Sequence, residues 1–540
     1  MKLVLVQPPI QDFYDTRVRL QPLGLAYLKS AVKKHLPEVE VVIKDFHQGR
    51  GRRTIALPRE LAYLKDYFPW PDQSPFSLFH HYYHFGASFE TVARETALEN
   101  PDLVGISSLF SPYYKEVLLS AEVIKEKTHC PIILGGSHVS SAPEIMLENP
   151  AVDWVIRGEG ERPLVELIKA WQNGNGWERV PGLGYKQEGR LVFNPPADPF
   201  PIEELPLPDF SDFDGQAYRY EKRPLCFILA SRGCPHHCSF CSVHNTFTGY
   251  QRRSAGDVFK EMECRYQEGY RVFDFEDDNL TYDQEEMKLL CRKIRQSIPS
   301  GEIELLAMNG ISYQSLDREL LRLMREAGFR HLNLSLVTSN PVVRKETLRS
   351  QRMEKYLQVV AEASRMGFKM VSYQILGLPG ETLESMIRTL RLNSRLPVLL
   401  GASPFYLTPN TVLAQKFKEQ TGEDMVRSRL TALGPETNRV GREAIYTLFV
   451  ATRIINFLKG LSFEEDSISL GEALKIAESR GKRSATGVEL FKRLMTEGCL
   501  YAAAPEGHKP LSRFRREVFF PLWNKLDFIK TQEGKIIRIK

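Results

Sequence analysis

Short apolar segments of strand length alternate with segments of helical periodicity along the first 170 residues, and this alternation constrains the fold more than any other feature of the chain. The apolar segments lie at 2–6, 39–43, 103–107, 131–134 and 152–156, and the helical segments lie at 22–34, 113–127, 142–148 and 161–172. Strands and helices in this order predict a parallel, doubly wound α/β sheet. Ligands of such sheets bind at the carboxyl ends of the strands.

A second array of the same kind begins near residue 225. Its candidate strands lie at 225–230, 271–276, 303–308, 331–336, 369–376 and 398–406. Six such strands, with helices between them, predict a partial (β/α)6 barrel whose chemistry takes place on the loops after the strands. Within this array, Ser254 three residues before Asp257 predicts a helix start, and a helix that ends before Gly328 is predicted by the apolar stripe Leu316, Leu320, Leu321 and Met324. Beyond about residue 420 the pattern is mostly helical, and it ends in a basic segment at 513–516.

Two segments interrupt the arrays. Residues 50–88 form an aromatic, proline-containing insertion, and residues 180–222 combine a turn at Gly189 with a proline-rich run from 195 to 208. The second segment predicts a small hairpin and then an extended linker. We therefore expect four parts, namely a Rossmann-like domain at 1–178, the hairpin and linker at 179–222, the partial barrel at 223–418 and a mostly helical C-terminal domain at 419–540.

The composition is that of a folded protein, with 42% hydrophobic and 26% charged residues in a chain of 540, a length that predicts several domains. Basic and acidic residues are nearly balanced, 72 against 67, so charge gives no reason to expect a nucleic-acid partner. The N-terminus has no apolar signal core, and no apolar run approaches the roughly 18 residues of a membrane helix. We expect a cytoplasmic protein without a membrane partner.

Three of the eight cysteines lie within one short loop, Cys234-Pro-His-His-Cys238-Ser-Phe-Cys241, directly after the first barrel strand. In a cytoplasmic protein such clustering predicts a metal site rather than disulfides. A 4Fe–4S cluster held by only three thiolates has one iron open to a small molecule. The alternative is a zinc site whose fourth ligand is His236, His237 or His244. We favour the iron–sulfur cluster, because zinc sites usually combine CxxC pairs and the chain has no second pair.

This spacing, with the aromatic Phe240 before the third cysteine, resembles the radical S-adenosylmethionine (SAM) superfamily over about residues 225–415. The resemblance implies that Cys234, Cys238 and Cys241 hold a 4Fe–4S cluster. Its open iron would chelate the amino and carboxylate groups of SAM. One-electron reduction would then cleave SAM to a 5′-deoxyadenosyl radical.

Two further segments match superfamily positions that contact SAM. The resemblance implies that Asp277 and Asp278 face the SAM ammonium, although an Asx turn or a helix cap also explains them. It implies that Gly377 and Glu381 lie beside the adenine, although a simple strand-to-helix turn explains these residues nearly as well. The chain has Val-Thr at 337–338 where relatives often have Glu-Ser, which puts the usual polar contact to SAM in doubt.

The first array resembles cobalamin-binding domains. Their SxL…GG signature is matched by Ser107, Leu109, Gly135 and Gly136, and a Gly-Glu-Gly-Glu segment follows at 158–161. The resemblance implies that these residues, with Gly158 and Glu159 of that segment, contact cobalamin. Small residues suit this role, because a nucleotide tail between sheet and helices needs the backbone close.

Many cobalamin domains supply a histidine to cobalt from the loop after the first strand, but segment 7–11 contains none. His47 follows the second strand instead, and we interpret its DxHxxG-like surroundings as coincidence. For His80, His81 and His84 of the insertion we expect surface or packing roles. Cobalamin would then bind without a protein histidine on cobalt.

The combined resemblance implies a cobalamin-dependent radical SAM enzyme. Our leading hypothesis is a methyltransferase that acts on an unactivated carbon of a small-molecule substrate, through a 5′-deoxyadenosyl radical and methylcobalamin. An electron donor such as flavodoxin or ferredoxin would be its partner. The alternatives are a non-methylating cyclase or ring-rearranging enzyme of the same class, a tRNA methylthiotransferase, which is disfavoured because only Cys130 lies in the N-terminal domain, and a non-catalytic cobalamin- or redox-binding protein. No general base or nucleophile can be named from the sequence.

Overall fold

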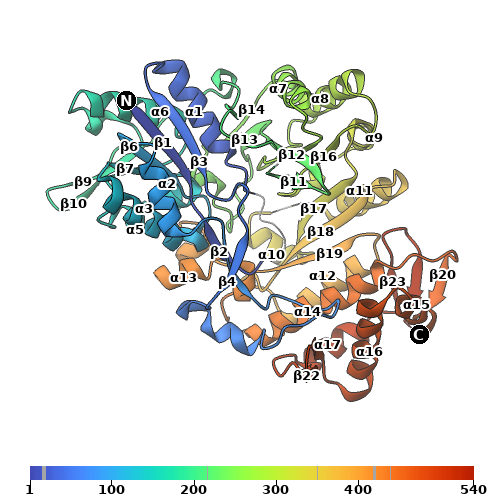
Figure 1. Ribbon diagram of the computed structural model, residues 1–540. Coiled ribbons are helices and arrows are strands. Elements are labelled where there is room, and N and C mark those ends of the chain that lie inside the picture. The colour runs from blue at the N-terminus through green and yellow to red at the C-terminus, as the bar shows by residue number, and fades with distance from the viewer. Residues whose placement is uncertain (15–19, 216, 350, 418–420, 438, 540) are drawn as a thin grey trace. The chain divides into compact units, whose positions relative to one another are not determined.

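The computed structural model describes residues 1–14, 20–215, 217–349, 351–417, 421–437 and 439–539. The chain divides into two compact units (Figure 1). Unit 1 comprises Met1–Ala56, Tyr82–Leu280 and Leu407–Ser428, and unit 2 comprises Leu57–His81, Thr281–Tyr406 and Arg429–Lys540.

A seven-stranded sheet forms the centre of the N-terminal part of unit 1, in the order β10-β9-β8-β7-β6-β1-β3. Its strands are β1 (Lys2–Gln7), β3 (Glu40–Asp45), β6 (Leu103–Ser107), β7 (Ile132–Gly135), β8 (Trp154–Ile156), β9 (Leu183–Gln187) and β10 (Arg190–Phe193). The first five are parallel, as predicted, and β9 and β10 form the predicted antiparallel hairpin. Chain order reverses between β1 and β6, which makes the carboxyl ends of these strands the topological switch point.

Helices cover both faces of this sheet. Helix α1 (Leu23–His35) packs against α6 (Glu161–Gln172), and α2 (Phe89–Ala97) packs against α3 (Tyr114–Thr128) on the opposite face (Figure 1). The apolar run of β1 is completely buried, as expected for a central parallel strand covered on both sides.

Helix α5 (Pro143–Leu147) matches the helix predicted at 142–148, and a short helix that was not predicted, α4 (Ser137–Ser141), precedes it. Pro143 causes the break between them, because a proline lacks the N–H that would continue the first helix and disfavours helical backbone at the residue before it. Ala142 accordingly has φ −147°.

The insertion contributes to both units. Strand β5 (Tyr82–Phe85) pairs with β2 (Ile10–Asp12) on one side and β4 (Arg52–Ile55) on the other, in a small antiparallel sheet of unit 1 that the sequence analysis did not predict. The middle of the insertion, with the 3-10 helix η1 (Arg59–Asp66), belongs to unit 2.

The rest of unit 1 carries the cysteine loop. Strand β12 (Arg223–Ile228) pairs in parallel with β15 (Val272–Phe275) and antiparallel with β11 (Arg219–Tyr220). Strands β13 (Ser231–Gly233) and β14 (Tyr250–Arg252) form an antiparallel pair on either side of the cysteines. Helix α7 (Ala255–Gln267) begins at Ser254, whose hydroxyl accepts from the Asp257 N–H as the capping pattern predicted.

Unit 2 contains the other four predicted barrel strands. They are β16 (Glu304–Leu306), β17 (His331–Val337), β18 (Lys369–Leu376) and β19 (Leu399–Pro404), of which the last three form a parallel sheet. The helices between them are α8 (Gln284–Ser297), α9 (Arg318–Ala327), α10 (Pro341–Glu346), α11 (Met353–Arg365) and α12 (Leu383–Ser394). The predicted apolar stripe of α9 is buried, and the helix ends at Gly328 with φ +125°.

The C-terminal part of unit 2 is helical, as predicted, but it also holds short strands. Its helices are α14 (Arg442–Lys459), α15 (Leu470–Ser479), α16 (Lys482–Glu497) and α17 (Arg516–Trp523), and its strands are β20 (Ser467–Ser469), β21 (Tyr501–Ala504), β22 (Gly507–Pro510), β23 (Phe528–Lys530) and β24 (Ile536–Arg538). Strands of three or four residues are too short to show a periodic pattern, so the sequence analysis missed them. Within the described residues, no helix combines the length and the apolar character of a membrane span.

Candidate functional site

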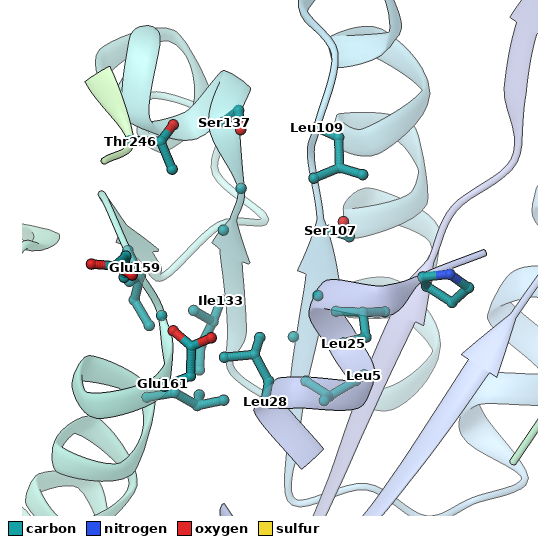
Figure 2. A pocket seen from close by; sticks show the side chains of 18 of the residues that line it. Leu5, Leu25, Leu28, Ser107, Leu109, Ile133, Ser137, Glu159, Glu161 and Thr246 are labelled. Atoms are coloured by element: carbon teal, nitrogen blue, oxygen red, sulfur yellow. The ribbon is translucent and has the colours of Figure 1, made fainter. Parts of the chain in front are cut away.

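A pocket lies at the carboxyl ends of β1, β6, β7 and β8, next to the switch point (Figure 2). The space between its walls, including the open mouth, is about 940 Å³. All six residues that the sequence analysis assigned to cobalamin line it, namely Ser107, Leu109, Gly135, Gly136, Gly158 and Glu159. Leu25 and Leu28 of α1 form part of its apolar wall (Figure 2).

Glycines give this pocket its width. No heavy atom lies within 4 Å of the position that a Cβ would take at Gly135 or at Gly24 in the first turn of α1. At Gly136, with φ +116°, a Cβ would lie 2.5 Å from the Ser108 carbonyl oxygen, so only glycine fits. A helical glycine costs about 0.5–1 kcal/mol relative to alanine. The empty space beside Gly24 therefore fits a site kept open for a ligand.

Two buried oxygen atoms in the pocket wall have no hydrogen-bond partner among the described residues. They are Oε1 of Gln7, at the end of β1, and Oγ1 of Thr246. Buried polar atoms are nearly always bonded to protein or to water. A mostly apolar pocket with a few unpaired polar groups is the usual form of a site for a large organic cofactor.

A buried ion-pair network closes one side of the pocket. Arg232 donates from Nη1 to Glu159 Oε1 at 2.9 Å and from Nη2 to Glu161 Oε1 at 2.5 Å. The three side chains are 8%, 8% and 5% exposed. The second Glu159 oxygen accepts from the Phe200 N–H at 2.9 Å. Burial raises the pKa of Glu159, and the guanidinium of Arg232 opposes this rise. Arg232 was not predicted as a site residue, although it lies only two residues before Cys234 in the sequence.

The cysteine loop follows β13. Cys238 is buried, and Cys234 and Cys241 are half-buried. Burial raises the pKa of the Cys234 thiol, and it raises the pKa of Cys241 to about 11. Three soft thiols on one loop are a suitable donor set for iron–sulfur chemistry.

The described residues contain no group of three histidine, cysteine or acidic side chains arranged to hold one metal ion. In a 4Fe–4S cluster each thiolate binds a different iron, so its cysteines need not converge on one point. The loop histidines considered for zinc pack together. The His237 and His244 rings stack with centroids 4.2 Å apart, and His244 Nε2 lies 2.8 Å from the His236 carbonyl oxygen.

Residues 277–279 bind the segment that leads into the cysteine loop, from Ala230 through β13 to Cys234. Asp277 accepts hydrogen bonds from the Ala230 N–H at 3.2 Å and the Ser231 hydroxyl at 2.5 Å, and Asp278 accepts from the Gly233 N–H at 3.0 Å. The Asn279 amide lies 3.5 Å from Cys234 Sγ. Asp277 is buried, with both oxygens bonded to the segment before the loop, whereas Asp278 is exposed. The segment assigned to SAM therefore also holds the loop in place.

Gly377 and Glu381 belong to unit 2 and have structural partners there. Gly377 has φ +83°, and a Cβ on it would lie 2.9 Å from Ile445 Cδ1. The buried Glu381 carboxylate accepts from the hydroxyls of Thr338 and Ser385, beside the start of α12. Val337, at the position where relatives often have Glu, has φ +70°, a conformation that costs a β-branched residue about 1–3 kcal/mol.

The remaining histidines have packing partners, as expected. His47 Nε2 lies 2.8 Å from the Pro8 carbonyl oxygen, and burial lowers the pKa of its ring to about 4. His84 is buried in β5, with Nε2 2.7 Å from the Ala87 carbonyl oxygen. The rings of His80 and His81 pack against each other.

Two family models match the chain. The radical SAM superfamily matches residues 228–392, and the B12 binding domain matches residues 78–168. Both resemblances drawn from the motifs are thereby confirmed. The chain is a cobalamin-binding radical SAM protein, with a 4Fe–4S cluster, SAM and cobalamin as its cofactors. It is accordingly a cobalamin-dependent radical SAM enzyme.

Relatives and solved structures agree with this class. An uncharacterised methyltransferase of Pyrococcus horikoshii is 23% identical over 84% of this chain and 94% of its own length. The anaerobic magnesium-protoporphyrin IX monomethyl ester cyclase of Cereibacter sphaeroides is 28% identical over 62% of this chain and 56% of its own length. The fold is similar to the radical SAM methyltransferase TsrM of Kitasatospora setae, with cobalamin and a [4Fe-4S] cluster bound (TM-score 0.58, 20% identity, 77% of each chain). It is also similar to OxsB with aqua-cobalamin and SAM bound (TM-score 0.61, 14% identity, 92% of this chain and 71% of OxsB).

Proposed function

We propose that this enzyme is a methyltransferase that moves the methyl group of SAM by way of cobalamin to an unactivated carbon of a small-molecule substrate. One observation supports the proposal: Arg232, Thr246 and Phe247, which flank the cysteine loop in sequence, line the pocket at the switch point. Both candidate cofactor sites therefore lie in unit 1. The similarity to a methyltransferase over most of both chains supports the same reaction.

The cofactors supply the reactive chemistry when bound, namely one-electron cleavage of SAM and methyl transfer through cobalt. The residues of this chain bind and orient them. We assign Cys234, Cys238 and Cys241 to three irons of the cluster, with Phe240 packed beside it. The exposed Asp278 has a carboxylate oxygen that is not bonded to Gly233, and we assign this residue to the SAM ammonium. The buried Asp277 holds the loop.

The pocket residues exclude water from cobalamin. We assign the nucleotide tail of cobalamin to the space beside Gly24, Gly135 and Gly136, where the backbone is open to a ligand. The apolar walls favour burial of the tail, and Gln7 and Thr246 offer hydrogen bonds to its polar groups. Gly377 and Glu381 stay candidates for the adenine side of the SAM site.

The test is a labelling experiment under anaerobic conditions. The full chain is reconstituted with iron, sulfide and hydroxocobalamin, then incubated with a reductant, SAM deuterated in its methyl group and the small-molecule fraction of the source cells. We expect 5′-deoxyadenosine together with a deuteriomethylated product, and loss of both in Cys238→Ala. Failure of a well-reconstituted protein to bind hydroxocobalamin would overturn the methyltransferase assignment.

A non-methylating cyclase is the second candidate, because three relatives with that printed function are 28%, 27% and 24% identical to this chain over the matched segments. The same experiment separates the two reactions. A cyclase would form 5′-deoxyadenosine and change the substrate without transfer of deuterium.

We further infer that a low-potential electron donor such as flavodoxin or ferredoxin reduces the cluster, and that the enzyme works in the cytoplasm. A reducing compartment keeps free thiols available for the cluster. Reduction by purified flavodoxin, followed by EPR spectroscopy, tests the donor.

A further inference from the structure

Arg232 connects the two candidate cofactor sites through one side chain. Its backbone lies in β13, where it pairs with Gln251 two residues before Cys234. Its guanidinium lies in the wall of the pocket, bonded to Glu159 and Glu161. Figure 2 shows these two glutamates on the side of the pocket opposite Ser107 and Leu109.

The surroundings of Arg232 hold this side chain in one position. Its guanidinium lies 5.6 Å from the centre of the Tyr27 ring and 5.9 Å from that of Phe247. Glu161 is the first residue of α6, where the helix dipole favours a carboxylate. Glu159 is held by the Phe200 N–H as well. A guanidinium can bond two separate carboxylates in a fixed geometry, which a lysine ammonium on its flexible stem does not match.

The network therefore ties the loop after β8 to the cysteine loop. The loop after β8 also holds Gly158, with φ +81°, which lines the same pocket. A ligand that orders this loop orders the carboxylates, and the carboxylates fix Arg232. Arg232 in turn fixes the strand that leads into Cys234. In the opposite direction, order in the cysteine loop reaches the pocket through the same contacts.

We propose that Arg232 is a positioning residue that couples cobalamin binding to assembly of the cluster. This inference rests on the proposed assignment of the two sites. By thermodynamic linkage, a cluster on the cysteine loop must raise the affinity of the pocket for cobalamin by the same factor as cobalamin raises the affinity for the cluster.

The experiment measures that factor with the full chain and hydroxocobalamin. The dissociation constant is determined anaerobically by absorbance, once for iron-free protein and once for protein reconstituted with iron and sulfide. We expect the wild type to bind about fivefold or more tightly with the cluster present, within the usual range of coupling between sites. In Arg232→Met this ratio falls to about 1, while each cofactor alone still binds.

Three further variants separate coupling from folding. Arg232→Lys can pair with only one carboxylate at a time and should give an intermediate ratio. Glu161→Gln keeps the size of the side chain but removes its charge, and it should also lower the ratio. This variant provides the test if Arg232→Met does not fold. The matched control is Glu268→Gln, which removes the carboxylate from the Arg265–Glu268 pair outside the pocket and should leave the ratio unchanged.

A ratio near 1 in the wild type would overturn the inference, and so would an unchanged ratio in Arg232→Met or Glu161→Gln. Those outcomes leave the proposed function intact, since both cofactors still bind. Failure of the iron-free and the reconstituted wild type to bind hydroxocobalamin would instead overturn both proposals.

Discussion

Single glycines define the space that the pocket offers to cobalamin. Gly135 ends β7 and borders open space, and its backbone conformation is one that other residues adopt. Valine suits a strand, so Gly135→Val should fold normally while its methyl groups occupy the pocket. We expect affinity for hydroxocobalamin to fall at least about tenfold, equivalent to 1.4 kcal/mol, in an absorbance titration.

Gly51 is the control for this substitution. It also borders open space but does not line the pocket, so Gly51→Val should bind as the wild type does. Unchanged affinity in Gly135→Val would mean that the tail of cobalamin lies elsewhere.

Asn279 affects the cluster through one hydrogen bond. Its amide lies 3.5 Å from Cys234 Sγ, and hydrogen bonds to the sulfur ligands help set the reduction potential of a cluster. An N–H dipole stabilises the extra negative charge of the reduced state, so Asn279→Leu should lower the potential. We expect a shift of about 59 mV, or tenfold less reduced cluster at a given solution potential for a one-electron couple, in an EPR redox titration.

Asn245→Leu is the control, because the Asn245 amide bonds to Ser141 and the Pro409 carbonyl, away from the thiols. Iron content should match the wild type in both variants. Equal potentials for the two variants would contradict the role of Asn279.

At the scale of elements, the end of β3 is held to the linker by a half-buried carboxylate. Asp45 accepts a hydrogen bond from the Tyr218 hydroxyl at 2.5 Å, and burial raises the pKa of Asp45 from 3.8 to about 6. The folded state therefore retains this proton more strongly than the unfolded state. Between pH 4 and pH 6 the contribution of Asp45 to stability falls as pH rises, and above pH 6 it is constant.

Asp45→Asn removes the free-energy cost of ionising this carboxylate in the folded state. We expect the variant to be more stable than the wild type at pH 7 by about 1–3 kcal/mol and equally stable at pH 4, as judged from urea unfolding midpoints. Tyr218→Phe should be less stable than the wild type at pH 7, because the ionised Asp45 carboxylate loses a hydrogen-bond donor. If Asp45→Asn and the wild type differ in stability by the same amount at pH 4 and pH 7, the raised pKa of Asp45 is contradicted.

At the scale of the whole molecule, unit 2 joins segments that are far apart in sequence. Phe76 of the insertion is buried against Phe457 of α14, with ring centroids 5.5 Å apart, and Tyr67 packs against Tyr446. Removing a buried phenylalanine ring costs about 3–5 kcal/mol. Phe76→Ala should therefore speed hydrogen exchange in α14, measured by mass spectrometry, while exchange in β1 stays unchanged.

Trp70→Ala is the control for this effect, because Trp70 belongs to the same segment but is 37% exposed. Its exchange pattern in α14 should equal that of the wild type. If hydrogen exchange in α14 of Phe76→Ala is as slow as in the wild type, the insertion does not stabilise unit 2.

Residue patterns within short windows were sufficient to predict most of the local structure and the cofactors. Apolar runs marked both arrays of strands, because a buried parallel strand is apolar on both faces. Ser254 and Gly328 marked helix ends through capping and left-handed backbone, both of which depend on neighbouring residues alone. The cysteine spacing and the glycines at 135–136 identified the cluster and the cobalamin domain, since these motifs place their residues on one loop or at one strand end.

Contacts between residues far apart in the sequence could be identified only in the folded chain. The side chain of Arg232 pairs with glutamates about 70 positions away, and the insertion at 57–81 packs on helix α14, more than 350 positions away. Strand β5 pairs with β2, about 70 positions before it, and with β4. Such contacts depend on loop closure and on packing among many candidate partners, and residue patterns within a short window do not record that choice.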